Sequence, residues 1–462
     1  MKKRIKIFIC KGTFYTILIC LICSLQSCEK FLDAKPSSKL DKMEPDYVPD
    51  LLDDFDIMNN RYPGEIENCT DDFFLLEAGY NALASSKYPQ DLYLWKGEAQ
   101  QTIIAPGWAD SYKVVYNANL ALETLAAGTG SLDPTLVNTL KGMAYFFRAY
   151  AHHQVAQSYA QPYDVATAGQ DAGIPIRTNT AVEVKSERGT VKETYDKIIA
   201  DFLQALPLLP VTSTIASRPN KAACYAALAR TYLSMQDYTN AGKMADECLK
   251  LYSVLIDYNS VSKTSLTPFP RFNAEVIFHA TLSGSLCANP VRAKIATDLY
   301  NSYEASDLRK VVFYKTTTGG FRWSGNYNPV TNNTFFSGLA TDEVYLIRAE
   351  CYARANNVAE ALADLNTLKI KRWNNTVAYV PVTASTAEEA LRLVLAERRK
   401  ELPFRGLRWV DLRRLNKDPR FQTTLSRTIG GVTYTLPPND LRYVLLISQS
   451  VIDNSNLLQN PR

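Results

Sequence analysis

Hydrophobic residues recur with a helical period in residues 341–372. They lie three or four positions apart, in one set before Asn356-Asn357 and one after it: Ala349 and Tyr352, then Ala361, Leu365 and Leu368. Each set lies along one face of an α-helix. The two asparagines suit a turn because they tolerate a left-handed backbone. We therefore predict two antiparallel helices, with Thr341 capping the first.

Residues 220–251 carry the same pattern. Both segments fit a register of about 34 residues, typical of tetratricopeptide helix pairs. Equivalent positions hold residues of the same kind: Ala229 and Ala349 in the first helix, Tyr232 and Tyr352 one turn later, and Ala241 and Ala361 where the helices cross. The alternative is two unrelated helix pairs, which pack by similar rules.

Helical spacing also marks several segments outside these repeats: 47–58, 112–126, 136–158, 190–206, 387–402 and 409–415. A hairpin is expected around Gly430-Gly431, within 426–436. Residues 253–337 break into short loops and strands. Long insertions of this kind often carry binding surfaces. The prediction is a mostly α, single-domain fold: a tetratricopeptide-type scaffold of helical pairs with a loop-rich insertion and a few short strands.

The N-terminus has the pattern of an export signal. Lys2, Lys3, Arg4 and Lys6 precede an apolar run that ends near Leu25. This run is too short for a comfortable membrane span. Leu25-Gln26-Ser27-Cys28 then resembles a bacterial lipobox, in which Cys28 becomes lipidated. We expect a signal peptide at 1–27, a lipidated tether at 28–50 and the folded domain at 51–462. A plain secretory signal or an uncleaved anchor is the alternative.

Charge and cysteine content exclude several classes of protein. The formal charge of +4 arises in the signal segment, and the remainder of the chain carries a net charge of −1. A chain that is nearly neutral outside its signal segment lacks the positive electrostatic potential that attracts nucleic acid. The nine cysteines fit neither a disulfide framework nor a zinc site.

The sequence lacks the common catalytic and cofactor motifs, including HExxH, GxSxG and a Walker loop. His152 and His153 are adjacent, so they point about 100° apart on a helix and cannot share a metal. We expect no enzymatic activity, no metal and no cofactor; substrate turnover by the purified protein would contradict this. Acids and arginines alternate from Glu397 to Arg413 around Trp409. This pattern predicts a buried ion-pair network that joins the C-terminal helices to the repeats.

Residues 396–415, AERRKELPFRGLRWVDLRRL, resemble the SusD/RagB family. Other family features follow in the same order along the chain: Cys28 with Phe31-Leu32-Asp33, Trp108 with Tyr116 and Asn119, Asp307 and Arg309, Glu343 to Glu350, and Gln459-Asn460-Pro461. Arg405 departs from the pattern, since the family usually has an acid there, and its presence predicts the loss of one local salt bridge. Residues 447–452 lack the family's usual proline and glutamate.

The resemblance implies a lipid-anchored outer-membrane protein that faces the cell exterior. It would bind oligosaccharide or peptide and deliver it to a SusC-like TonB-dependent outer-membrane transporter, with no chemistry of its own. The alternative function is a tetratricopeptide adaptor lipoprotein that assembles periplasmic or outer-membrane complexes.

Aromatic residues beside arginine are the candidates for binding a ligand. Sugar rings stack on aromatic faces, and polar neighbours bond their hydroxyls. Tyr93 and Trp95 are expected on one side of an extended segment. The second group lies in the insertion: Arg322, Trp323 and Tyr327. The alternative is that these rings fill the underside of loops, whereas Trp108, Trp373 and Trp409 are assigned to the core. The neutral body and these aromatics favour glycan over peptide.

Overall fold

The computed structural model describes residues 43–462, so the predicted signal peptide, Cys28 and most of the tether lie outside the described residues. Residues 45–462 form one unit. Its helices are α3 (Val48–Asp53), α4 (Phe55–Met58), α5 (Glu77–Asn81), α6 (Lys87–Tyr93), α7 (Pro106–Ala127), α8 (Pro134–Tyr159), α9 (Val191–Leu208), α10 (Lys221–Ser234), α11 (Tyr238–Leu251), α12 (Thr297–Asn301), α13 (Arg309–Val312), α14 (Thr341–Arg354), α15 (Val358–Arg372), α16 (Ala387–Glu401), α17 (Arg408–Leu415) and α18 (Gln449–Asp453).

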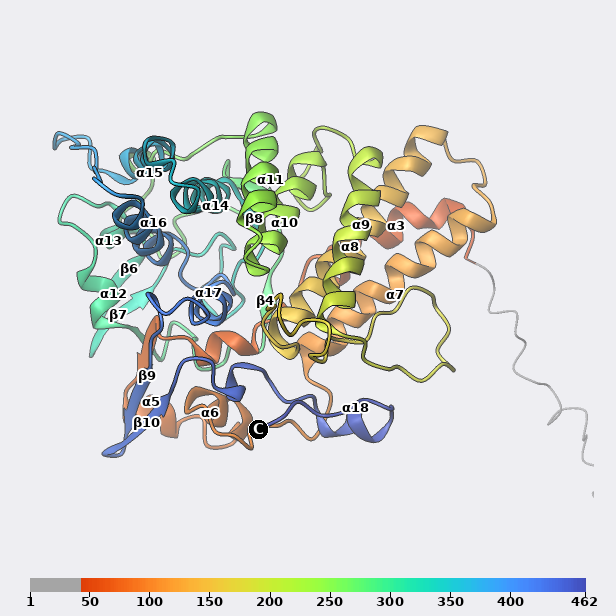
Figure 1. The fold of residues 1–462 in the computed structure, drawn as a ribbon, viewed down its shortest axis with the longest axis horizontal. Coiled ribbons are helices and arrows are strands. Elements are labelled where there is room, and N and C mark those ends of the chain that lie inside the picture. The colour runs from red at the N-terminus through yellow and green to blue at the C-terminus, as the bar shows by residue number, and fades with distance from the viewer. Residues whose placement is uncertain (1–42) are drawn as a thin grey trace, which may run out of the picture. The chain divides into compact units, whose positions relative to one another are not determined.

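The two predicted repeats are the helical pairs α10–α11 and α14–α15. Helix α11 packs against α14, so the repeats are neighbours in space although the insertion separates them in sequence (Figure 1). Ala229, Ala349, Ala241 and Ala361 are all fully buried, which confirms the close approach of the helices. Tyr232 and Tyr352 are half-buried and pack against the core. The mostly helical scaffold is therefore confirmed.

The predicted helices are present, but several of their ends differ from the prediction: segment 47–58 is divided into α3 and α4 at Asp54, and α7 begins at Pro106 rather than at 112. Asn356 has a φ of 63°, as predicted for its turn, and Gln236 adopts a φ of 62° in the equivalent turn of the first repeat. Thr341 does not cap α14; Ala340 holds that position, and the Thr341 hydroxyl donates instead to the Val254 carbonyl. The helix predicted at 190–206 extends to Leu208, so Pro207 lies inside the last turn of α9.

The strands are short and occur in pairs. They are β1 (Tyr62–Pro63) with β4 (Leu282–Ser283), β2 (Phe73–Leu75) with β5 (Ala293–Ile295), β3 (Val276–Phe278) with β8 (Leu339–Ala340), β6 (Tyr314–Thr317) with β7 (Gly320–Trp323), and β9 (Leu425–Ile429) with β10 (Val432–Leu436). The β1–β4 pair is parallel and the others are antiparallel. The last pair is the predicted hairpin.

The insertion is better packed than its sequence suggested. Its strands β4 and β5 pair with β1 and β2, near the start of the domain. Phe269, Phe278 and Phe313 of the insertion are buried in the main core. Because these contacts fix much of the segment, only part of it is free to form a recognition surface.

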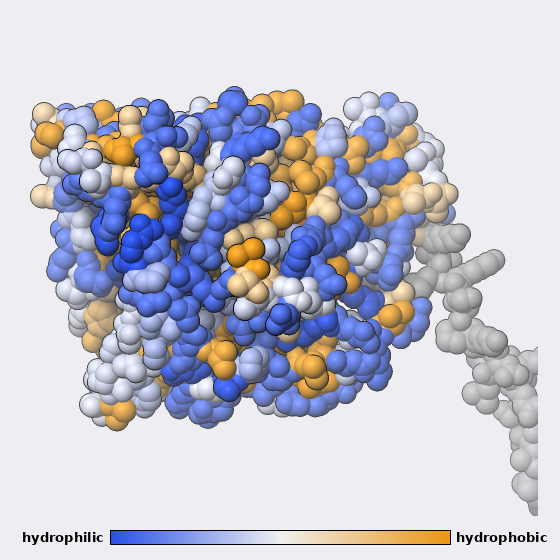
Figure 2. All heavy atoms as spheres, viewed as in Figure 1, coloured by the Kyte–Doolittle hydropathy of each residue, from blue (hydrophilic) through white to orange (hydrophobic). Residues whose placement is uncertain are grey.

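Hydrophilic residues cover most of the face seen in Figure 2, with small, separate hydrophobic patches. Trp108 and Trp409 are buried as predicted, but Trp373 is only half-buried. None of the helices within residues 43–462 combines the length and apolar character of a membrane span.

Candidate ligand-binding site

The aromatic side chains selected from the sequence are covered. Tyr93 is 1% exposed, Trp95 3%, Trp323 4% and Tyr327 1%, whereas Arg322 is half-buried. The expected extended segment is wrong: Tyr93 ends α6, and Trp95 follows in a turn with a φ of 51°. The rings therefore present no open face of the kind that sugar stacking uses, and their ligand-binding role stays a prediction.

Two of these aromatics form the back of a cleft. Tyr93 and Trp95 line a cavity of about 510 Å³ between β2, the start of α12 and residues 423–428. The indole of Trp95 donates to the Cys69 carbonyl at 2.9 Å, and the Tyr93 hydroxyl accepts from the Leu75 amide at 2.8 Å. Both rings are thus fixed under the cleft.

Arg427 covers these two rings. Its guanidinium carbon lies 3.9 Å from the centre of the Tyr93 ring and 4.5 Å from that of Trp95. Its nitrogens donate to the carbonyl oxygens of Asn68, Thr70 and Tyr93. Because the guanidinium of Arg427 is engaged by these rings and carbonyls, we interpret Arg427 as a structural part of the cleft wall.

The open surface of the cleft is rich in hydroxyl groups. Along β9, Leu425 and Arg427 point inward while Ser426 and Thr428 point outward, as the alternation of a strand requires. Thr424 and Thr297 are also exposed and line the same cavity. Phe74 stands half-buried between the buried Phe73 and Leu75, so it supplies the aromatic surface that Tyr93 and Trp95 do not.

The acidic residues of the cleft already have partners. Arg408 donates to both carboxylate oxygens of Asp71 at 2.6 and 2.7 Å, and Arg399 donates to Asp298 at 2.7 Å. Burial opposes ionisation of Asp71, but Arg408 and Arg399 outweigh it and hold the Asp71 pKa well below its usual range. Burial raises the pKa of Asp72, deeper in the wall, to about 6 despite Arg399. The cleft is therefore suited to hydrogen bonding with a neutral ligand.

The other group of aromatics belongs to the interior. Trp323 packs with its ring centre 5.0 Å from those of Phe313 and Phe404. The Tyr327 hydroxyl donates to Glu275, beside the guanidinium of Arg405, whose carbon lies 4.2 Å from the Tyr327 ring centre. Neither ring lines the cleft, so the structure does not bring the five predicted residues together around one ligand.

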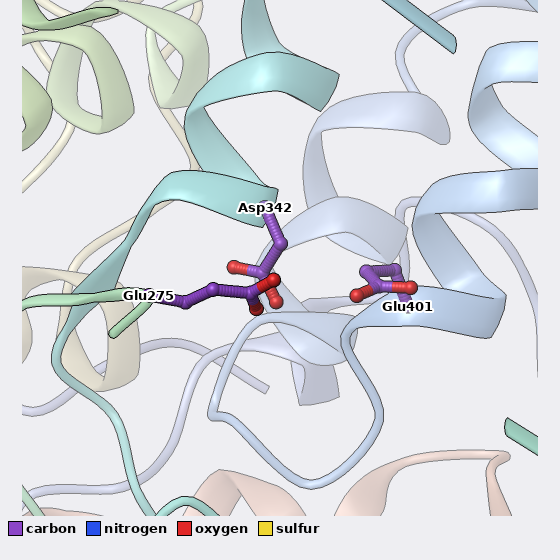
Figure 3. Close-up of side chains that lie close together, drawn as sticks. All are labelled: Glu275, Asp342 and Glu401. Atoms are coloured by element: carbon purple, nitrogen blue, oxygen red, sulfur yellow. The ribbon is translucent and has the colours of Figure 1, made fainter. Parts of the chain in front are cut away.

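Three buried carboxylates lie close together in this interior: Glu275, Asp342 and Glu401 (Figure 3). Each has a guanidinium partner. Arg372 reaches Glu275 at 2.8 Å and Glu401 at 2.7 Å, while Arg405 reaches Asp342 at 2.8 Å. Burial raises the pKa of Glu275 to about 7. Because arginines hold the positions that a cation would take, we interpret the cluster as a structural ion-pair network.

The predicted ion-pair network around Trp409 is confirmed and is larger than expected. Arg398 pairs with Asp411 at 2.8 Å, and Arg414 pairs with Glu350 on the second repeat at 2.6 Å. Arg405, where the family usually has an acid, instead pairs with Asp342 at the start of α14 at 2.8 Å. These pairs join the C-terminal helices to the repeats.

Comparison with known proteins decides the family. A family model described as "Starch-binding associating with outer membrane" matches residues 30–233, and the SusD family model matches residues 270–461. The chain belongs to the SusD/RagB family. The family is associated with the outer membrane, in keeping with the first of these descriptions.

This SusD/RagB protein has relatives in several bacteria. It is 24% identical over 426 residues to SusD-like protein P2 of Formosa agariphila, covering 78% of this chain and 80% of that one. A SusD superfamily protein of Bacteroides thetaiotaomicron superimposes with a TM-score of 0.72 at 21% identity, over 91% of this chain and 100% of that one. A laminarin binding SusD-like protein gives a TM-score of 0.63 at 15% identity, over 90% and 97% of the two chains.

Sequence reasoning missed the open part of the cleft in this SusD/RagB protein. The outward positions of the predicted hairpin, Ser426 and Thr428, were visible in the alternation of the strand. Phe74 carried no comparable signal, because the adjacent Phe73 has the same chemistry and is buried.

Proposed function

We propose that the protein is a non-catalytic, cell-surface nutrient-binding lipoprotein that captures oligosaccharide in the cleft between β2, α12 and β9. The observation that carries the proposal is the hydroxyl-rich surface of Thr297, Thr424, Ser426 and Thr428 beside the half-exposed Phe74. Hydroxyls can exchange hydrogen bonds with a sugar while a ring covers its apolar face. The match to the family model described as starch-binding and the likeness to a laminarin binding SusD-like protein add support.

Within this proposal, Tyr93 and Trp95 act indirectly. They support Arg427, which shapes the back of the cleft, and so they position the surface rather than touch the sugar. Arg322, Trp323 and Tyr327 support the neighbouring interior. A peptide remains the second ligand class, because a cleft with strand backbone and hydroxyls can also bond an extended chain.

The proposal includes lipidation of Cys28 and delivery of the ligand to a SusC-like TonB-dependent transporter. Membership of the family and the lipobox pattern at 25–28 support these two parts of the proposal. Purification of the native protein from outer membranes should recover a large transporter. A periplasmic adaptor, the alternative function, would be protected from protease added to intact cells, whereas a surface protein would be cleaved.

The binding test compares wild type with Phe74→Ala on a glycan array and a peptide library. Tyr47→Ala is the control, because Tyr47 is exposed and lies outside the cleft. Loss of one stacking ring should weaken glycan binding about fivefold, since such contacts are worth roughly 1 kcal/mol. Equal binding by Phe74→Ala and wild type would reject the cleft, and binding of peptides alone would reject the glycan.

A further inference from the structure

A second groove lies along α7, away from the cleft described above. It has a volume of about 360 Å³ and is lined by one face of α7, residues 177–186 of the α8–α9 connection, and Asn454 with Ser455 after α18. In Figure 1 the β9–β10 hairpin of the cleft and the α7–α18 region of the groove lie toward opposite sides of the lower part of the domain. The two sets of lining residues do not overlap, so the groove and the cleft are separate sites.

The floor of the groove is aromatic. Tyr112 and Tyr116 are four residues apart, so they stand one above the other on the same face of α7, about one helical turn apart. The Tyr112 hydroxyl donates to the Pro175 carbonyl at 2.8 Å, which fixes that ring. Tyr116 is 36% exposed. An extended ligand that lies along α7 can therefore meet both rings in turn.

The wall of the groove is held in place by polar contacts from α7. Asn119 donates to the carbonyls of Arg177 and Asn179 at 3.2 and 3.1 Å. Glu123 accepts from the amide and the hydroxyl of Thr180 at 2.9 and 2.6 Å. A wall that is ordered before binding reduces the entropy lost when a ligand binds.

Arg177 stabilises the far end of the same wall. Its guanidinium donates to the Val184 carbonyl at 2.8 Å and also to the Ala181 carbonyl and the Ser186 hydroxyl. The charge of Arg177 is thus engaged within the loop and is not offered to an anionic ligand.

The remaining groups of the wall suit a neutral, amphipathic ligand. Val182 is 82% exposed and Val184 57%, although the loop that carries them is held by the contacts above. Glu183 and Lys185 alternate with them and are opposite in charge. Asn179 and Asn454 add amide groups. Apolar patches for the C–H faces of sugars and amides for their hydroxyls occur together in carbohydrate sites.

We propose that this groove is a second saccharide-binding site, which takes a neutral stretch of oligosaccharide on Tyr112 and Tyr116. It shares only the ligand class with the proposed function. With two sites, one molecule holds a long glycan at two points, or two glycan chains at once. The second contact on one chain is intramolecular, so it strengthens the binding of polymers more than that of short oligosaccharides.

The test is affinity gel electrophoresis in gels containing laminarin, amylopectin or galactomannan. Four variants are compared with wild type: Tyr116→Ala in the groove, Phe74→Ala in the cleft, the double variant, and Tyr47→Ala as the exposed-tyrosine control. On the polysaccharide that retards wild type, we expect Tyr116→Ala to weaken apparent affinity about tenfold, the double variant to migrate freely, and Tyr47→Ala to match wild type.

The outcomes separate the two proposals. If Phe74→Ala abolishes retardation and Tyr116→Ala matches wild type, the groove is refuted and the cleft stands. If Tyr116→Ala weakens retardation and Phe74→Ala does not, the groove stands and the cleft is refuted. If none of the three polysaccharides retards the wild-type protein, both are overturned. Circular dichroism of each variant checks that a lost interaction does not reflect unfolding.

Discussion

Glu67 should make the stability of this protein fall as the pH rises. The residue is fully buried; one carboxylate oxygen accepts from the Gly406 amide at 2.6 Å, and the other has no hydrogen-bond partner among the described residues. Burial, with the nearby Asp72, raises the pKa of Glu67 from 4.5 to about 8. The folded state therefore favours the protonated acid.

The sign and size follow from linkage. Below pH 4.5 the acid is protonated in both the folded and the unfolded chain, and its contribution to stability is fully present. As the pH rises toward 8, the unfolded chain loses this proton first, and each pH unit removes up to about 1.4 kcal/mol of the free energy of unfolding. Across the whole interval the loss is on the order of 4 kcal/mol.

Replacement of Glu67 by glutamine removes this titration with little change in shape. Urea unfolding of wild type and Glu67→Gln is measured from pH 4.5 to pH 8.5, and the difference between the two free energies is plotted against pH. Titrating groups that do not interact with Glu67 are present in both proteins and cancel in this difference, whereas the neighbouring Asp72 contributes to it. We expect it to shift in favour of the variant by a few kcal/mol as the pH rises, whereas Glu360→Gln, at an exposed glutamate of α15, should give a flat line. A flat line for Glu67→Gln as well would refute the reasoning.

Two further predictions concern the scaffold. Arg414→Met leaves the buried Glu350 with Arg354 as its remaining partner, so the free energy of unfolding should fall by about 3–5 kcal/mol. The double variant Arg414→Met with Glu350→Gln should recover part of this loss. If the two single losses measured by urea unfolding simply add in the double variant, the pairing of Arg414 with Glu350 is wrong. Ala361→Leu inserts a larger side chain where α14 and α15 cross and should cost about 1–3 kcal/mol. Ala363→Leu, on the exposed face of the same helix, is the control. Equal melting temperatures for the Ala361→Leu and Ala363→Leu variants would contradict the close packing of α14 and α15 at Ala361.

The repeats could be predicted from the sequence because their signal is local. Alanines at 229 and 241 in the first repeat, and at 349 and 361 in the second, permit close helix packing. The two alanines of each repeat lie within one period of about 34 residues. The hairpin at 425–436 was predictable for the same reason, from its strand alternation and Gly430-Gly431. In these segments the residues that decide the structure are neighbours in the chain.

The candidate cleft could not be predicted, because its parts come from three distant segments. Tyr93 and Trp95 look available in the sequence, but Arg427, more than 300 positions later, lies against both rings. Phe73 and Phe74 differ only in which side of β2 they occupy, and that depends on the pairing of β2 with β5 in the insertion. Sequence patterns within one segment show neither the contact with Arg427 nor which side of β2 each phenylalanine occupies.

Arg405 shows how charge balance constrains the buried ion-pair network around Glu275, Asp342 and Glu401. Glu275, Asp342 and Glu401 are compensated by Arg372, Arg405 and Arg309, the last at 2.6 Å from Glu401. An acid at position 405 would place four carboxylates against two guanidinium groups in the buried interior. The electrostatic cost of an unpaired buried charge is several kcal/mol, so that arrangement would require an acid to be lost or a base to be gained nearby. Arg405 is therefore matched to Asp342 and Tyr327 of this chain, and its side chain connects the turn before α17 to the start of the second repeat.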